Sequence, residues 1–146
     1  MKKTTLENKI IGIKPERIYD VLNGRRNKYA LASELGKPSK KYWKIAAKTL
    51  RVKEIPYKKF DELWTTIFWP NKKTFSLLKK LRKRGYKLAC ISNINFSHKR
   101  YLLKKYKFRK IFDILILSCD VKTRKPNPKI YRLALKRLNV KPEEAV

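Results

Sequence analysis

Apolar residues in the first half of the chain recur every three or four positions, which is the spacing of amphipathic helices. We expect three such helices before residue 70, and no strand. Ser39 is a candidate cap for the second helix, and the stretch 23–38 before it is expected to be loop with some helix. The expected inward positions are Ile18, Val21 and Leu22, then Trp43, Ala46, Ala47 and Leu50, and finally Phe60, Leu63, Trp64, Ile67 and Phe68.

After residue 70, helical patterns alternate with short apolar runs. Asn71 can cap a helix that Gly85 ends. The runs YKLACIS (86–92) and FDILILS (112–118) are typical of strands buried on both faces. The segment between them, 97–106, has helical spacing. A last helix is expected after the second run, with asparagine as its cap and proline in its first turn.

This alternation predicts an α/β fold, with a partial Rossmann-like parallel sheet as its core and a helical region in front of it. Parallel strands joined by a helix have their carboxyl ends along the same edge of the sheet. Ser92 and Asn93 close the first strand, and Lys125 lies in the loop after the second. We therefore expect these two stretches to meet at the edge where open α/β sheets bind ligands.

The residues at this edge are suited to an anion. The Ser92 hydroxyl, the Asn93 backbone N–H and the start of the next helix can donate hydrogen bonds to a phosphate, and Lys125 can add a positive charge. Each half has an ordinary alternative: Ser-Asn after a strand is a common turn, and Lys125 is one of many lysines. The combination of both halves is more specific than either.

The segments YKLACISN and FDILILSCDVKTRKPNPKIYRLALKRLNVKPEEAV resemble the second and third motifs of the haloacid dehalogenase-like hydrolase superfamily. KPNPKIY is the most specific piece. The helices upstream resemble the α-helical cap of the phosphatase-like members. The resemblance implies that residues 1–70 form the cap region and residues 71–146 a partial α/β core.

The same resemblance implies roles for three residues. Ser92 and Lys125 would be catalytic: Ser92 would bind the transferring phosphoryl oxygen, and Lys125 would stabilise phosphate and nucleophile. Asn93 would bind the substrate by helping to position it. The parent enzyme would be a Mg²⁺-dependent phosphoric monoester hydrolase that acts on a small phosphorylated substrate through an aspartyl-phosphate. A haloacid dehalogenase, which needs no metal, is the alternative within the family.

The chain also departs from the family pattern. The family's nucleophile lies in an Asp-x-Asp motif and its fourth motif is an acidic pair, and neither is present. Lys122 stands where many members have glycine, and Asn127 where aspartate is commoner. We expect the chain to be a fragment of a longer reading frame. The fragment would lack metal ligands and would be inactive alone. The alternatives are a chain that assembles with a separately encoded partner and a natural non-catalytic remnant. The chain has four aspartates, Asp20, Asp61, Asp113 and Asp120, and none of them lies in an Asp-x-Asp motif.

Charge supports a further alternative, a basic nucleic-acid-binding module without chemistry. The chain of 146 residues has 40 Lys and Arg against 11 Asp and Glu, a formal net charge of +29. Because the cations occur in nearly every segment, we favour a generally basic surface with weak polyanion binding. No apolar run reaches the roughly 18 residues of a membrane span, and the N-terminus has no secretory signal pattern. Cys90 and Cys119 are expected to be buried, reduced thiols of a cytoplasmic protein.

Overall fold

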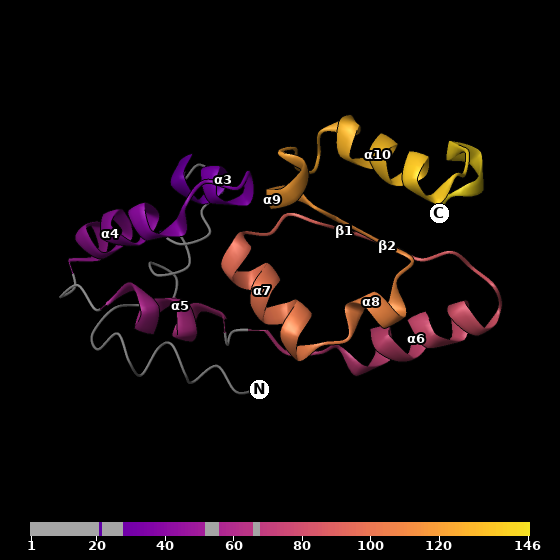
Figure 1. Ribbon diagram of the computed structural model, residues 1–146, viewed down its shortest axis with the longest axis horizontal. Coiled ribbons are helices and arrows are strands. Elements are labelled where there is room, and N and C mark those ends of the chain that lie inside the picture. The colour runs from indigo at the N-terminus through magenta and orange to yellow at the C-terminus, as the bar shows by residue number, and fades with distance from the viewer. Residues whose placement is uncertain (1–20, 22–27, 52–55, 66–67) are drawn as a thin grey trace. The chain divides into compact units, whose positions relative to one another are not determined.

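The computed structural model describes residues 21, 28–51, 56–65 and 68–146 (Figure 1). The chain divides into two compact units. The helical unit lies within residues 1–33 and 37–68, and the α/β unit comprises residues 34–36 and 69–146. The short segment 34–36 therefore belongs to the α/β unit although it interrupts the helical unit along the chain. The assignment of residues 1–70 as a cap stays a prediction.

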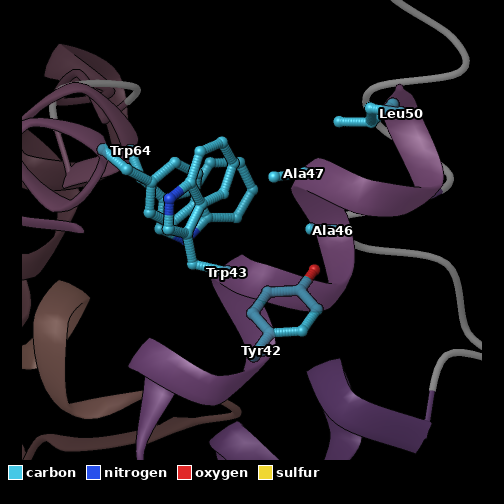
Figure 2. Close-up of a cluster of buried hydrophobic side chains, with 7 residues drawn as sticks. Tyr42, Trp43, Ala46, Ala47, Leu50 and Trp64 are labelled. Atoms are coloured by element: carbon cyan, nitrogen blue, oxygen red, sulfur yellow. The ribbon is translucent and has the colours of Figure 1, made fainter. Parts of the chain in front are cut away.

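The helical unit is held together by aromatic side chains from two helices. Its elements are α3 (Lys28–Glu34), α4 (Ser39–Leu50) and α5 (Tyr57–Thr65). The ring of Phe60 stacks on Trp43, with 3.9 Å between centroids and 12° between planes, and also on Trp64 at 6.0 Å. Figure 2 shows Trp43 and Trp64 together with the buried side chains of α4. Of the predicted inward residues in α4 and α5, Trp43, Ala46, Ala47, Leu50, Phe60 and Trp64 are buried, and Tyr42, which was not predicted, is buried with them.

One capping prediction was wrong. α4 begins at Ser39 itself, and Pro38 occupies the N-cap position without a side-chain hydrogen bond. A proline with φ near −60° is already in the conformation that leads into a helix, so the serine is not needed as a cap there. The helix expected around Ile18 falls outside the described residues, except for Val21, whose carbonyl accepts a hydrogen bond of 3.0 Å from the Tyr42 hydroxyl.

The α/β unit contains the three helices and two strands that the sequence predicted, together with two short helices, at residues 108–111 and 118–121, that it did not predict. Asparagine side chains cap three of its helices: Asn71 accepts from Thr74 N–H, and Asn95 and Asn127 do the same for the helices that follow them. Gly85, at φ 82°, comes just after the first of these helices. The elements are α6 (Lys72–Lys83), β1 (Ala89–Ser92), α7 (Phe96–Lys105), α8 (Phe108–Ile111), β2 (Ile114–Leu117), α9 (Ser118–Val121), α10 (Pro128–Leu138) and a 3-10 turn, η1 (Pro142–Glu144).

The two strands pair in parallel, with Ala89 opposite Ile114 and Ser92 opposite Leu117. Helix α10 lies on one side of the strands, while α7 and α8 lie on the other (Figure 1). Side chains of β2 accordingly point alternately into two small cores. The core under α10 contains Ile116, Ile130 and Ala134, and the core on the α7 side contains Ile94, Leu117 and Cys119. The predicted α/β class with a parallel sheet is confirmed.

Both strands are shorter than the apolar runs that predicted them. Tyr86 and Lys87 are exposed and precede β1, and Ser118 already belongs to α9. Pairing begins at Asp113, whose carboxylate accepts from Leu88 N–H at 2.7 Å while its own N–H donates to Leu88 C=O at 2.8 Å. This two-way bond fixes the register of the sheet at the end opposite to Ser92.

Two predictions from composition are answered by the fold. Both cysteines are free thiols; Cys119 is fully buried, whereas Cys90 is only half-buried. No helix in the described ranges has the length and apolar character to cross a bilayer.

The stack of aromatic rings gives a stability prediction. Trp43 is 1% exposed, so Trp43→Ala is expected to lower the free energy of unfolding by about 3–5 kcal/mol through lost burial and an unfilled cavity. Trp69, which is 80% exposed, is the matched control. Trp69→Ala is expected to change the free energy of unfolding by less than about 0.5 kcal/mol. Urea unfolding followed by circular dichroism measures both. Equal losses in the two variants would contradict the assignment of this core.

Candidate functional site

The candidate site lies at the carboxyl ends of β1 and β2. Ser92 is the last residue of β1, and Asn93 begins the loop that leads to α7. On the neighbouring strand, Leu117 is followed by α9 and then by the loop that contains Lys125. The right-handed parallel connection places both loops at the same edge of the sheet. We call these two segments, residues 92–95 and 122–127, the rim.

A single side chain joins the two loops of the rim. The Asn93 carboxamide oxygen accepts a hydrogen bond from Lys125 N–H at 2.8 Å, and its nitrogen donates to Lys125 C=O at 3.0 Å. The carboxamide therefore binds the backbone of Lys125 as a neighbouring strand would. The next peptide bond, Lys125–Pro126, is cis. The stretches that the sequence predicted to meet do meet, although 32 positions separate them along the chain.

Ser118 ties the rim together a second time. Its buried hydroxyl accepts from Ile94 N–H at 2.9 Å and lies 2.7 Å from Glu34 C=O, to which it donates. The Glu34 carboxylate in turn accepts from Arg124 Nε at 2.8 Å. Ser118, Glu34 and Arg124 thus link the loop after β1, the loop after β2 and the segment 34–36.

The departure from the family pattern at Lys122 has a visible backbone counterpart. Lys122 has φ 54°, in the left-handed region, where a glycine has no Cβ to clash. The lysine side chain makes contacts that a glycine cannot. Its ammonium donates to Cys119 C=O at 2.8 Å and lies 5.2 Å from the ring centroid of Phe96. These contacts offset the cost of the left-handed backbone and pin α9 to the start of α7.

Three polar groups of the rim have no hydrogen bond or ion pair in the part of the chain that the structure describes: the Ser92 hydroxyl, the Thr123 hydroxyl and the Lys125 ammonium. Burial raises the pKa of the half-buried Cys90 thiol, and the charge of Lys125 opposes this by lowering the same pKa. Cys90 and Ser92 are two positions apart on β1 and so lie on the same face of the strand. The Lys125 charge therefore acts on a thiol that shares a strand face with Ser92.

The helix starts contribute less than the sequence suggested. The side chain of Asn95 accepts from His98 N–H at 2.9 Å, and that of Asn127 accepts from Lys129 N–H at 2.9 Å. These amides are consequently already used by the caps. The donors that stay open to an anion include the Asn93 backbone N–H, the Ser92 hydroxyl and Lys125.

The carboxylates of the α/β unit near the strands are already paired. Asp113 accepts from Leu88 N–H and lies 3.4 Å from Arg82, Asp120 lies 2.6 Å from Lys99, and Glu34 binds Arg124. Among the described residues no three His, Cys, Asp or Glu side chains lie close enough together to hold a metal ion. Near the strands, the described part of the chain therefore has neither an unpaired aspartate nor a cluster of side chains that could hold a metal ion.

Some residues of the site were missed by sequence reasoning. Ser118 follows the second strand just as Ser92 closes the first, and this parallel position could have identified it. Glu34 gave no such signal, because its partners Ser118 and Arg124 lie 84 and 90 positions away.

Comparison with known proteins assigns the chain to a class. The sequence pattern of the haloacid dehalogenase-like hydrolases matches residues 61–146. The chain belongs to the haloacid dehalogenase-like hydrolase family. The predicted resemblance is therefore confirmed, and it extends over more than half of the chain.

Curated relatives include enzymes of two kinds. The chain is 39% identical over 67 residues to (S)-2-haloacid dehalogenase 4A of Burkholderia cepacia, covering 46% of this chain and 29% of the dehalogenase. It is 35% identical over 69 residues to a phosphorylated carbohydrates phosphatase of Thermotoga maritima, covering 47% and 32%. These matches thus span about a third of the length of the curated relatives.

Solved structures share the fold. A HAD family enzyme from Bacteroides thetaiotaomicron, crystallised as an aspartate-to-alanine mutant with magnesium and inorganic phosphate, superimposes with a TM-score of 0.69 at 23% identity. The match covers 92% of this chain and 76% of that enzyme.

The Asn93–Lys125 pairing predicts a stability loss that is specific to the rim. Asn93→Ala removes both hydrogen bonds and leaves two backbone groups of Lys125 unpaired, so it is expected to lower the free energy of unfolding by about 1–3 kcal/mol. It should also speed hydrogen exchange of the Lys125 amide. The control Asn71→Ala removes one cap bond away from the rim and should leave that exchange rate unchanged. Unaltered exchange in Asn93→Ala would contradict the pairing.

The position of the Lys125 ammonium can be tested through Cys90. Because the lysine charge lowers the pKa of that thiol, Lys125→Met is expected to raise it further. The rate of alkylation by iodoacetamide should then need a higher pH to reach half its maximum. The experiment uses a Cys119→Ala background, so that one thiol reports, and Lys129→Met as the charge-matched control. A midpoint that moves equally in both variants would show that the charge acts through the general field of the protein.

Proposed function

We propose that this chain carries the phosphate-binding half of a phosphatase-type active site. The Ser92 hydroxyl and the Asn93 backbone N–H would donate to phosphoryl oxygens. The Lys125 ammonium would offset their negative charge. The Asn93 side chain would not touch the substrate, because both of its polar atoms already bind Lys125. Asn93 would therefore act in two ways, as a donor through its backbone and as a positioning residue through its carboxamide.

One observation supports this proposal above the others. The Lys125 backbone is bound at both of its polar groups by the residue that follows Ser92, while the Ser92 hydroxyl and the Lys125 ammonium keep no partner among the described residues. A preorganised donor and a preorganised charge, both unused, are what stabilises a dianionic group without further rearrangement. A purely structural role for this rim would not need either group to be left open.

The reaction needs parts that lie outside the described residues. Transfer through an aspartyl-phosphate requires a carboxylate in line with the phosphorus atom. None of the four aspartates stands in an Asp-x-Asp motif, and Asp113 and Asp120 are already paired. Magnesium belongs, in this proposal, to the complete enzyme, since the described side chains do not form a site for it. The chain alone is therefore expected not to turn over.

Similarity to known proteins supports phosphorylated small molecules as the substrates of the complete enzyme. Several relatives are named as phosphatases, among them the phosphorylated carbohydrates phosphatase and a glyceraldehyde 3-phosphate phosphatase of Methanopyrus kandleri, 36% identical over 69 residues. A 2-haloacid dehalogenase is the second candidate, favoured by the 39% identity to the Burkholderia cepacia enzyme. Its substrate carries one carboxylate charge, whereas a phosphate monoester carries about two at neutral pH.

Titration with inorganic phosphate tests the proposal on the chain itself. Amide resonances of Ser92, Asn93 and Lys125 are expected to shift in a saturable manner, and Ser92→Ala combined with Lys125→Met should weaken that binding at least about tenfold. Lys129→Met is the matched control and should leave the affinity within about twofold. Titration with 2-chloropropionate in parallel should cause smaller shifts at the same amides.

Three results would contradict the proposal. Shifts spread evenly over the lysine-rich surface would indicate charge alone. Tighter binding of 2-chloropropionate than of phosphate would favour the dehalogenase. Hydrolysis of a generic phosphate ester by the chain, lost in the double variant, would show that a nucleophile is present after all.

A further inference from the structure

A pocket lies along the outer edge of β2. It has a volume of about 400 Å³ and is lined by residues around β2 and by side chains of α7, α8, α9 and α10. No residue of β1 lines it. Since β1 pairs with one edge of β2, the pocket lies at the other edge. That edge has no partner strand in the described part of the chain.

The backbone of β2 offers hydrogen-bonding groups to this pocket. Ile114 N–H points toward β1, where it meets Leu88 C=O at 3.4 Å. In a parallel ladder, alternate residues use their backbone groups on opposite edges. The N–H and C=O of Leu115 and the N–H of Leu117 therefore face the outer edge. An extended segment lying in the pocket could pair with them.

The lining of the pocket mixes apolar and polar side chains, and its open charges are positive. Leu103, Phe112, Leu115 and Leu117 contribute apolar side chains. Both acidic residues in the lining are already engaged, Asp113 with Arg82 and Asp120 with Lys99. The arginines in the lining, Arg109 and Arg137, have no hydrogen bond or ion pair within the described ranges.

These two arginines lie at the same end of β2, one on each side of the sheet. Arg109 belongs to α8, which ends just before β2 begins. Arg137 belongs to the last turn of α10, and this turn lies at the amino ends of the strands because Lys87 Nζ donates to Leu138 C=O at 3.0 Å. α10 and α8 lie on opposite sides of the strands (Figure 1). Two cations thus flank the amino-terminal end of the open edge.

We propose that this edge binds an extended acidic peptide segment of another protein. The segment adds to the sheet as a further strand, its apolar side chains pack against the half-buried Leu103, Phe112 and Leu115, and its carboxylates lie next to Arg109 and Arg137. β2 has four residues, so about 13 Å of extended peptide is enough to follow it. This is the β-augmentation mode, in which backbone hydrogen bonds give affinity and side-chain contacts give specificity.

Charge and chemistry exclude the other occupants. A second copy of this chain carries the same net charge of +29 and would be repelled from two unpaired arginines. A nucleic acid would satisfy the arginines, but its sugar-phosphate backbone has no row of amide groups to pair with Leu115 and Leu117. The inference uses none of the rim residues, so it stands or falls independently of the proposed phosphate site.

The test uses the full chain and a short synthetic peptide of valines and isoleucines with aspartates at one end, labelled with a fluorophore. Its anisotropy is titrated at physiological salt. Arg109→Glu and Arg137→Glu are each expected to weaken binding about tenfold. Arg132→Glu is the matched control, because Arg132 is exposed on α10 and does not line the pocket, and it should change affinity by less than about twofold. Hydrogen exchange of the Leu115 amide should slow when the peptide binds.

A second peptide separates strand addition from simple charge attraction. It has the same sequence but carries N-methyl groups on alternate backbone amides, so its charge and side chains are kept while strand pairing is blocked. Its affinity is expected to fall at least about tenfold. The proposal is overturned if neither peptide binds, if both bind equally, or if Arg132→Glu costs as much as Arg109→Glu. A single-stranded oligonucleotide of equal charge that binds more tightly through the same arginines would also overturn it, in favour of a polyanion surface.

Discussion

The carboxamide of Asn93 holds the Lys125 backbone from both sides, at 2.8 Å and 3.0 Å, and the geometry of the candidate site follows from this bond pair. The ammonium of a lysine lies at the end of a flexible side chain, so its position is poorly defined unless the lysine backbone is fixed. Here the residue after the serine fixes the Lys125 backbone directly, so one side chain holds together the two loops that carry the groups proposed to bind an anion. Because a carboxamide has both a donor and an acceptor, neither aspartate nor alanine could do the same.

Further contacts stabilise the two loops that this bond pair joins. Ser118 and the Glu34–Arg124 pair brace the same loops from behind, and the ammonium of Lys122 joins α9 to the start of α7. Each of these polar or charged groups has a partner, whereas the Ser92 hydroxyl and the Lys125 ammonium have none among the described residues. Rigid support around a few open groups is the usual design of a binding site on an α/β sheet. Because the chain belongs to the haloacid dehalogenase-like hydrolase family, we interpret these open groups as candidates for binding an anionic substrate.

Local signals in the sequence predicted local features of the fold well. Asn71 and Asn127 cap their helices, Gly85 follows α6 in a left-handed conformation, and the stripe from Trp43 to Trp64 is buried. The meeting of the two rim loops was also predictable, because a helical crossover between parallel strands leaves little choice of topology. Ser39 failed as a cap because Pro38 precedes it, and propensity alone does not weigh neighbours in this way. The contacts of Glu34 were out of reach, since no periodicity connects residues so distant in the chain.

The segment 34–36 has a consequence for how the protein is made. It belongs to the α/β unit, yet it is synthesised more than 80 residues before Ser118 and Arg124, which hold it. On the ribosome, at about 5–20 residues per second, it waits for several seconds until its partners emerge. Contacts of such high sequence separation form late because a long loop must close first. The bracing of the rim is thus among the final events of folding, after both the aromatic stack and the two-stranded sheet can have formed.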